Sequence, residues 1–311
     1  MKRLIAIWHK IIAYAPSSVG RSYLLVLSWM CRQFMHDKLA SKVRNSVASA
    51  NWPQMELPPR SVRVGNETYI KLIPHIGEFD GDALFYKTMP YEHPVFVWLE
   101  HECAERYDMV IEIGANVGIY TTFLGKLIDS GVLKRVIAFE PAPKAYGRLI
   151  DNLKANDLLG NPVTFPAAVA DKTGWLSFYE PSSHLTNGSL DPRFAAYFSE
   201  TVNEIMVPAV DAAFLEALVL DGERVLLKID VEGYEPQLLA SLSGFIEKHK
   251  PDLIVEVLQE TESGISEWLE DQSYKPKLFT KDGLRELSFC AHQDGRDWFF
   301  EYSGQDRFAK H

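Results

Sequence analysis

Residues 109–120 constrain the fold of this chain more than any other segment. They read M-V-I-E-I-G-A-N-V-G-I-Y, and apolar residues then recur at helical spacing through Ile128. A buried strand that leads into a tight glycine turn and a helix N-terminus is typical of nucleotide and nucleoside sites. The turn has the form E-x-G-x-N-x-G instead of G-x-G-x-x-G. It therefore favours a nucleoside that carries an amino acid, which needs acceptors for its amine and hydroxyls, over a pyrophosphate.

From this segment onward, predicted strands and helices alternate. Such alternation indicates an α/β fold with a doubly wound, mainly parallel sheet. An insertion at about 174–220 interrupts the order, and the last runs predict an antiparallel C-terminal edge. The predicted strands are 109–113, 135–139, 163–169, 225–229 and 253–257, with helices at 93–106, 118–130, 143–156, 234–249 and 266–271; the insertion holds strands at 175–179 and 204–210, and the edge comprises 277–280 with 287–290, and 298–302.

The N-terminal region differs from the rest in charge. Residues 1–50 hold eight lysines and arginines against one aspartate, a balance of +7. Because the net charge of the chain is −10, the remaining residues carry −17. We expect two domains: a basic helical extension with a proline-rich linker at 1–59, and an α/β domain at 60–311. The extension is predicted to hold two helical segments that Pro16 separates, and a hairpin is predicted around Gly65. The acidic body makes nucleic acid an unsuitable partner.

The first helical segment places Leu4, Trp8, Ile11, Ile12 and Ala15 on one face. We expect this face to pack on its own domain or on a second subunit in a homo-oligomer, and the alternative is peripheral membrane contact through residues 1–50. No apolar run approaches the ~20 residues that span a bilayer, and His9 and Lys10 interrupt the stretch that a signal peptide would need. Three widely spaced cysteines indicate reduced thiols and a cytoplasmic location.

A second acid stands at the end of the next predicted strand. Glu140 follows V-I-A-F and precedes Pro141, about one βα unit after the glycine turn. An acid in this place can accept hydrogen bonds from both hydroxyls of a ribose. NAD enzymes use the same device, so this acid indicates a nucleoside, and the asparagine of the turn favours S-adenosylmethionine over NAD.

Charged residues also gather after the strand at 225–229. The chain there reads V-L-L-K-I-D-V-E-G-Y-E, which puts Lys228, Asp230 and Glu232 at a strand end. In an open α/β sheet the ligand crevice lies outside the carboxyl ends of the strands. We therefore expect Asp230 and Glu232 to face a ligand, although Asp230 as a helix cap and Glu232 as a solvated side chain are the structural alternatives.

Taken together, E-I-G-A-N-V-G, A-F-E-P-A-P, N-x-x-x-N at residues 152–156, K-I-D-V-E-G-Y-E and K-P-D-L-I-V-E-V resemble the FkbM family of S-adenosylmethionine-dependent methyltransferases over about 92–260. The resemblance implies a class I methyltransferase fold and methyl transfer, most often to a hydroxyl of a sugar or natural product. It implies that the cofactor contacts Glu112, Gly114, Ala115, Asn116, Gly118, Glu140, Pro141 and Ala168, and that Asp230 and Glu232 face the methyl group. Glu112 stands where Asp is commoner, and Tyr234 where a small residue is commoner.

The expected function is O-methylation of a small-molecule or glycan acceptor, with Asp230 or Glu232 as the general base. A divalent metal held by these acids is an alternative, although no metal ligand is assigned. Residues 184–189 and 193–197 are predicted to form a lid over the acceptor. An NAD-dependent oxidoreductase and a non-catalytic partner-binding protein remain the alternative functions.

Overall fold

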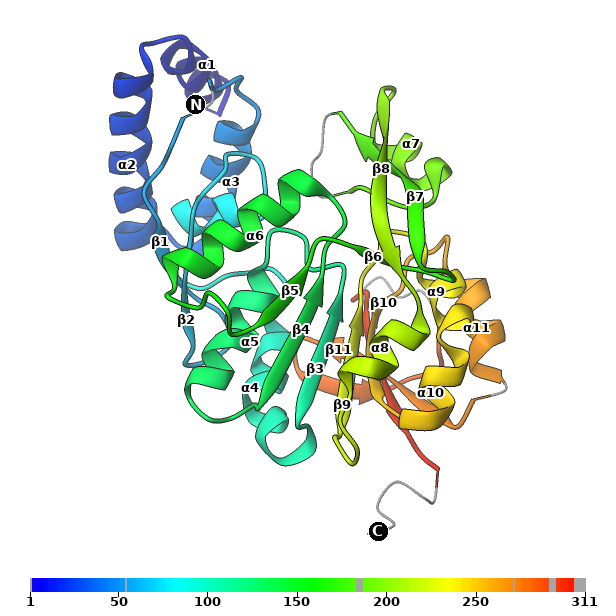
Figure 1. Ribbon diagram of the computed structural model, residues 1–311. Coiled ribbons are helices and arrows are strands. Elements are labelled where there is room, and N and C mark those ends of the chain that lie inside the picture. The colour runs from blue at the N-terminus through cyan, green and yellow to red at the C-terminus, as the bar shows by residue number, and fades with distance from the viewer. Residues whose placement is uncertain (1, 54, 183–186, 271, 291–294, 305–311) are drawn as a thin grey trace.

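The computed structural model describes residues 2–53, 55–182, 187–270, 272–290 and 295–304. Its main sheet has eight strands in the order β12-β11-β13-β10-β9-β3-β4-β5 (Figure 1). Five strands are parallel, and the three at the C-terminal edge are antiparallel. The strands are β3 (Met109–Ile113), β4 (Arg135–Phe139), β5 (Val163–Phe165), β9 (Val225–Ile229), β10 (Asp252–Glu256), β11 (Tyr274–Thr280), β12 (Gly283–Glu286) and β13 (Asp297–Tyr302). The predicted α/β class and the antiparallel edge are therefore confirmed.

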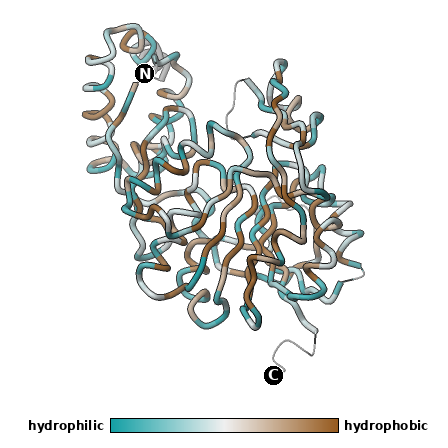
Figure 2. Tube along the Cα trace, in the orientation of Figure 1, coloured by the Kyte–Doolittle hydropathy of each residue, from teal (hydrophilic) through white to brown (hydrophobic). Residues whose placement is uncertain are grey.

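Side chains of each strand alternate between two hydrophobic cores, because successive residues of a strand point to opposite faces. Val110 and Leu226 belong to one core, with residues from α4 and α5. Ile111 and Leu227 belong to the other, with residues from α8 to α11. Apolar residues accordingly concentrate on the central strands in Figure 2. The helices are α4 (His93–Arg106), α5 (Ile119–Asp129), α6 (Pro143–Ala155), α8 (Ala212–Leu218), α9 (Glu235–Ser241), α10 (Ser243–His249) and α11 (Glu262–Glu270).

The insertion folds as a separate three-stranded sheet, with the order β6-β8-β7. Its elements are β6 (Ala168–Val169), β7 (Gly174–Pro181), α7 (Pro192–Phe198) and β8 (Val202–Val210). The prediction of one strand at 163–169 is wrong, because only β5 pairs with β4, whereas Ala168 pairs with Ala209 of β8. Pro166 stands between the two pieces, and a proline cannot donate to a sheet ladder. The chain therefore changes sheets at this residue.

At the C-terminal edge, one strand pairing differs from the prediction. Strand β11 pairs with residues 283–286, and not with 287–290 as predicted. Asp282-Gly283 is a hairpin signal, and Gly283 adopts a φ of +102°. The chain therefore reverses earlier than the apolar run at 287–290 suggested.

The N-terminal region forms three helices, not the predicted two: α1 (Lys2–Ala13), α2 (Ser17–Phe34) and α3 (Asp37–Ala48). The second break falls at Met35 and His36, where the ring Nδ1 of His36 accepts the Leu39 amide and caps α3. Histidine is not among the usual N-cap residues, so this boundary carried little sequence signal. None of the described helices is long and apolar enough to cross a membrane.

These three helices, residues 2–48, are called the helical unit below. Helices α2 and α3 share a core with Leu84, Phe85 and Tyr86, which lie in or directly after the 3₁₀ helix η1 (Asp80–Leu84). Arg44 forms an ion pair with Asp82, and Arg32 donates to the carbonyl oxygens of Ala83 and Ser61. The predicted hairpin is present as β1 (Arg60–Arg63) and β2 (Tyr69–Leu72). The helical unit is therefore attached to the start of the α/β domain, and the boundary at residue 59 stays a prediction.

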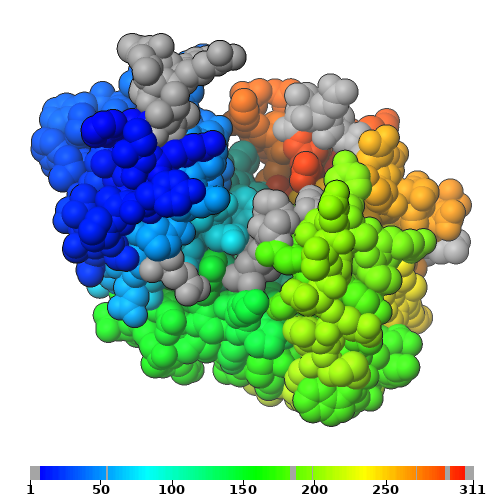
Figure 3. All heavy atoms as spheres, turned by 90° about the horizontal axis from the view of Figure 1, so that it is seen from above, coloured from blue at the N-terminus to red at the C-terminus, as the bar shows by residue number. Residues whose placement is uncertain are grey.

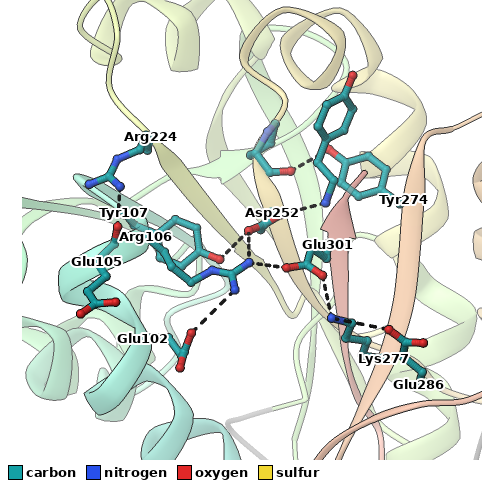
Figure 4. Close-up of polar contacts among 12 residues, drawn as sticks. Glu102, Glu105, Arg106, Tyr107, Arg224, Asp252, Tyr274, Lys277, Glu286 and Glu301 are labelled. Atoms are coloured by element: carbon teal, nitrogen blue, oxygen red, sulfur yellow. Dashed lines mark hydrogen bonds and ion pairs between the residues drawn. The ribbon is translucent and has the colours of Figure 1, made fainter. Parts of the chain in front are cut away.

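A polar network joins α4 to the start of β10 and the end of β13 (Figure 4). Asp252 is fully buried, and its carboxylate accepts hydrogen bonds from the Tyr107 hydroxyl (2.6 Å) and the Tyr302 amide (2.8 Å). Arg106 contacts Asp252 at 3.3 Å and also pairs with Glu301. A buried carboxylate with such partners is costly to alter, since each donor would lose its acceptor.

We expect Asp252→Asn to lower the free energy of unfolding by about 2–4 kcal/mol, because an amide cannot accept from all three donors. Glu286 is the matched control, since it lies at the edge of the same network, is mostly exposed and approaches Lys277 only at 3.9 Å. Glu286→Gln should change the free energy of unfolding by less than about 0.5 kcal/mol. Urea denaturation measures both variants, and equal effects would contradict the assigned role of Asp252.

Candidate functional site

A cavity of about 1810 Å³ lies at the carboxyl ends of β3, β4, β9 and β10. Figure 3 looks onto this end of the molecule, which is hollowed between the N-terminal part, the insertion and the C-terminal edge. Nine of the ten residues predicted to bind cofactor or act in catalysis line the cavity: Glu112, Gly114, Ala115, Asn116, Glu140, Pro141, Ala168, Asp230 and Glu232. The structure therefore brings together residues from the ends of β3, β4 and β9, and adds Ala168 from β6.

The glycine turn after β3 packs against two neighbouring strand ends. The amides of Gly114 and Ala115 both donate to the Phe139 carbonyl oxygen, at 3.0 and 2.9 Å. Gly114 adopts a φ of +90°, and a Cβ at this position would lie 1.7 Å from the Asp230 carbonyl oxygen. Only glycine fits this contact. The turn and the Asp230 segment thus form one continuous floor.

Gly118 is the predicted cofactor residue that does not line the cavity. It is the N-cap of α5, with a φ of +79°. A Cβ here would meet Leu149 of α6 at 2.7 Å. Its observed contacts are therefore with the neighbouring helix, and it shapes the turn from behind.

Glu140 connects the ends of β3 and β4. Its carboxylate accepts the Asn116 amide at 2.7 Å and the Ala142 amide at 2.8 Å, one on each oxygen. Burial raises the pKa of Glu140 to about 7, against the lowering effect of these two hydrogen bonds. A carboxylate offers about four acceptor positions, so this side chain retains capacity for two ligand hydroxyls. The left-handed φ of Asn116, +52°, directs its amide into this contact.

Glu112 lies within β3, opposite Lys228 of β9 in the sheet register. It is buried and accepts a hydrogen bond from the Thr121 hydroxyl at 2.7 Å. Burial raises the pKa of Glu112 to about 7, while the charge of Lys228 lowers it. The acid therefore lies where it can meet a cationic ligand group, with its position fixed by α5.

Lys228 neutralises part of the acidic end of β9. Its ammonium group lies 3.1 Å from the Asp230 carboxylate and 4.4 Å from the centre of the Tyr120 ring. Burial lowers the pKa of Lys228, but the charge of Asp230 and other nearby acids raises it above its ordinary value overall. Asp230 is therefore held in an ion pair, which makes it less available as a base.

Five acids form one side of the cavity, and we call them the acidic wall: Glu92, Asp230, Glu232, Glu256 and Asp297. Glu256 and Asp297 are paired across β10 and β13, and like charges directly opposite each other destabilise a sheet. Burial and the charge of Asp230 raise the pKa of Glu232 well above its ordinary value. Burial and the charge of Glu92 do the same to the pKa of Asp297.

Backbone strain is concentrated at this site. Among the described residues, five that are not glycine have a positive φ, and Glu92, Asn116 and Glu232 of these line the cavity. Such conformations cost about 1–3 kcal/mol each and persist where the surroundings fix them, often at functional sites. Glu232 has a φ of +53° and is followed by Gly233. A side chain at position 233 would place its Cβ 2.5 Å from the Phe194 ring, so this position requires glycine.

The insertion borders the cavity opposite the helical unit. Asn187, Gly188, Arg193, Phe194 and Tyr197 line it. Of the predicted lid, residues 184–186 lie outside the described residues, and closure of the remainder stays a prediction.

Several residues that line the cavity were not predicted from the sequence. Glu256 is the last residue of β10 and lies one residue before the end of the predicted strand 253–257, so its place near a strand end was visible in the sequence. Asp297 becomes recognisable only once β13 is known to pair with β10. Glu92 carried no signal, because it caps α4 from a loop; its carboxylate accepts a hydrogen bond from the Tyr120 hydroxyl. Among the described residues, no three or more His, Cys, Asp or Glu side chains are grouped as a metal site requires.

The chain is similar to several known methyltransferases. The family described as methyltransferase FkbM domain matches residues 112–276, more than half of the 311-residue chain. Methyltransferase sdnD of Sordaria araneosa is 26% identical over 251 residues, which cover 70% of this chain and 91% of that protein. The chain is also similar to the crystal structure of methyltransferase FkbM from Methylobacillus flagellatus, at 15% identity and a TM-score of 0.42, covering 62% of this chain and 43% of that one. For a SAM-dependent O-methyltransferase from Thermotoga maritima, the identity is 13%, the TM-score 0.38 and the coverage 80% of each chain.

Proposed function

This chain belongs to the FkbM family of methyltransferases, and on that premise we propose that it transfers the methyl group of S-adenosylmethionine to a hydroxyl oxygen of a sugar, a glycan or a related natural product. The observation that carries the proposal is the division of one cavity into two parts. Glu112, Asn116 and Glu140 lie at the ends of β3 and β4, and the acidic wall lies across the ends of β9 and β10. One part suits the cofactor, and the other suits the acceptor.

The chemistry of the first part fits S-adenosylmethionine. Glu140 has acceptor capacity for the two ribose hydroxyls, and Pro141 and Ala168 offer apolar surface for the adenine. Glu112 and the turn from Gly114 would receive the amino-acid end. Bound S-adenosylmethionine would supply an electrophilic methyl group. The chain itself then needs only to align the acceptor and to remove its proton.

Glu232 is the better candidate of the two predicted bases. Asp230 is paired with Lys228 at 3.1 Å, whereas Glu232 lines the cavity with a raised pKa. A carboxylate with a raised pKa is, once ionised, a stronger base toward a hydroxyl proton than an ordinary carboxylate. We assign proton removal to Glu232 and orientation of the acceptor to Asp230, with Lys228 holding Asp230 in place.

The cavity also supports a hydroxyl-bearing acceptor. Its volume of about 1810 Å³ exceeds the ~300–1,000 Å³ of a typical small-molecule site, which leaves room for an acceptor beside the cofactor. The carboxyl oxygens of the acidic wall can accept hydrogen bonds from several hydroxyls. A strongly anionic acceptor would be repelled by the same wall.

Cofactor binding should depend on pH through Glu140. Ribose hydroxyls donate to the ionised carboxylate, so binding favours deprotonation of a group whose pKa is about 7. Affinity should therefore rise as the pH increases through 7 and fall below it, with release of protons on binding near neutrality. Calorimetry in buffers of different ionisation enthalpy measures this release, and proton uptake near pH 7 would contradict the assignment.

The test of the acceptor chemistry uses isotope-labelled S-adenosylmethionine. The protein is incubated with labelled cofactor and with small molecules extracted from its source, and methylated products are identified by mass spectrometry and carbon NMR. We expect the label on oxygen, with activity unchanged by a chelator. A label on nitrogen or carbon would contradict O-methylation, and loss of activity with chelator would favour a metal held by the acidic wall.

A further inference from the structure

The outward face of α2 carries no charged residue. Val19, Val26, Trp29, Met30 and Phe34 are exposed, and they fall on one side of the helix together with Ser22 and Gln33. The opposite side packs inward through its buried residues, Gly20, Leu24, Ser28 and Cys31. A surface helix normally presents charged and polar residues to water. The exposed rings of Trp29 and Phe34 contact each other edge to face, with 5.2 Å between ring centres.

The neighbouring helix α1 also turns its apolar face outward. Trp8 is 54% exposed, Ile11 56%, and Tyr14, directly after the helix, 82%. The inward face is formed instead by His9 and Ala13, and His9 makes a hydrogen bond to the Ser46 hydroxyl of α3 at 2.9 Å. Trp8 and Ile11 of the predicted face are therefore exposed, whereas Ile12 and Ala15 are half-buried, so this face packs only in part on its own domain. About half of all exposed large hydrophobic side chains among the described residues lie within residues 8–34.

The helical unit also carries exposed cations. Lys10, Arg21, Lys38 and Lys42 are exposed on the helical unit. Residues 1–50 carry +7, whereas the rest of the chain carries −17. The molecule is thus strongly polarised, with its positive end and its exposed aromatic residues in the same three helices. Figure 1 shows α2 at the outer edge of the molecule, remote from α8 to α11.

We propose that the apolar faces of α1 and α2 dock on an anionic lipid membrane. Tryptophan, phenylalanine and isoleucine enter the boundary between headgroups and acyl chains, and the exposed lysines and arginine contact the headgroups. A second copy of this chain fits less well. In a two-fold dimer the same patch meets itself, so the positive helical unit would face another positive one. Peripheral docking would also hold the cavity near the lipid surface, since Asp37, the first residue of α3, lies on its lining.

The experiment is flotation of the full-length protein with vesicles. One set is pure phosphatidylcholine, and the other contains equal parts of phosphatidylcholine and phosphatidylglycerol. We expect binding to the second set, weaker binding as salt increases, and a blue shift of tryptophan fluorescence. Trp29→Glu together with Phe34→Glu should reduce the vesicle partition coefficient at least about tenfold. Two aromatic side chains that would be buried in the lipid are then replaced by negative charges.

Trp175→Glu is the matched control, since Trp175 is 67% exposed on β7 of the insertion and far from the helical unit in sequence. It should float as the unaltered protein does. Two results would overturn the proposal: no flotation with the anionic vesicles, or a concentration-dependent dimer in solution that Trp29→Glu dissociates. Circular dichroism of each variant separates loss of docking from loss of folding.

Discussion

Glu232→Gln is expected to lower kcat by about 10²–10⁴-fold while S-adenosylmethionine still binds. Glutamine has nearly the same shape as glutamate but cannot take a proton from the acceptor. The residue lines the cavity in a left-handed conformation, and burial beside Asp230 raises its pKa. Single-turnover methyl transfer measures the rate, and calorimetry measures cofactor affinity. Because the base must be ionised, the wild-type rate should fall as the pH falls below the pKa of Glu232.

Two further variants make this result specific. Glu256→Gln removes another acid of the wall but not the assigned base, so its effect on kcat should be smaller than that of Glu232→Gln. Asp230→Asn should mainly raise the KM for the acceptor, because Asp230 is assigned to orientation. The two roles would have to be exchanged if Glu232→Gln remained active and Asp230→Asn lowered kcat by about 10²–10⁴-fold instead. Full activity of both variants would remove the acids as bases.

Glu140→Ala is expected to weaken S-adenosylmethionine binding by about 10²-fold or more. Without the carboxylate, the ribose hydroxyls would lose their acceptor. Each hydrogen bond to a charged group contributes about 1.5–3 kcal/mol to binding. The amides of Asn116 and Ala142 would also lose their acceptor, which loosens both turns at the cavity. Calorimetric titration measures the affinity of the variant.

The control for this variant is Glu204→Ala on β8. Glu204 is exposed and accepts a hydrogen bond from the Ser177 hydroxyl, away from the cavity. Its loss should leave cofactor affinity within about twofold. Urea denaturation separates lost affinity from lost folding in both variants. Unchanged affinity in a folded Glu140→Ala protein would mean that the ribose is bound elsewhere.

The centre of the sheet could be predicted from sequence because its signals are local. The ranges of β3, β4 and β9 agree with the predicted strands, since each is a short apolar run that ends at an acid or a glycine. Parallel strands also place their carboxyl ends at one edge, so Glu112, Glu140 and Asp230 could be placed together without coordinates.

The remaining features depend on contacts between distant segments. Asp297 joins the acidic wall only because β13 pairs with β10, and no pattern near residue 297 reveals that register. Glu92 reaches the cavity from a loop and is held there by Tyr120 of α5. The sequence pattern of α1 located an apolar face correctly, but periodicity does not say whether such a face points inward or outward. His9, paired with Ser46, takes the inward position instead.

The most direct test of this account is calorimetric titration of the protein with S-adenosylmethionine, S-adenosylhomocysteine and NAD under the same conditions. We expect saturable binding of the first two at one site, loss of that binding in Glu140→Ala, and no saturable binding of NAD. Saturable binding of NAD with no heat from S-adenosylmethionine would contradict it, because the Glu112–Gly118 turn and Glu140 would then serve a dinucleotide.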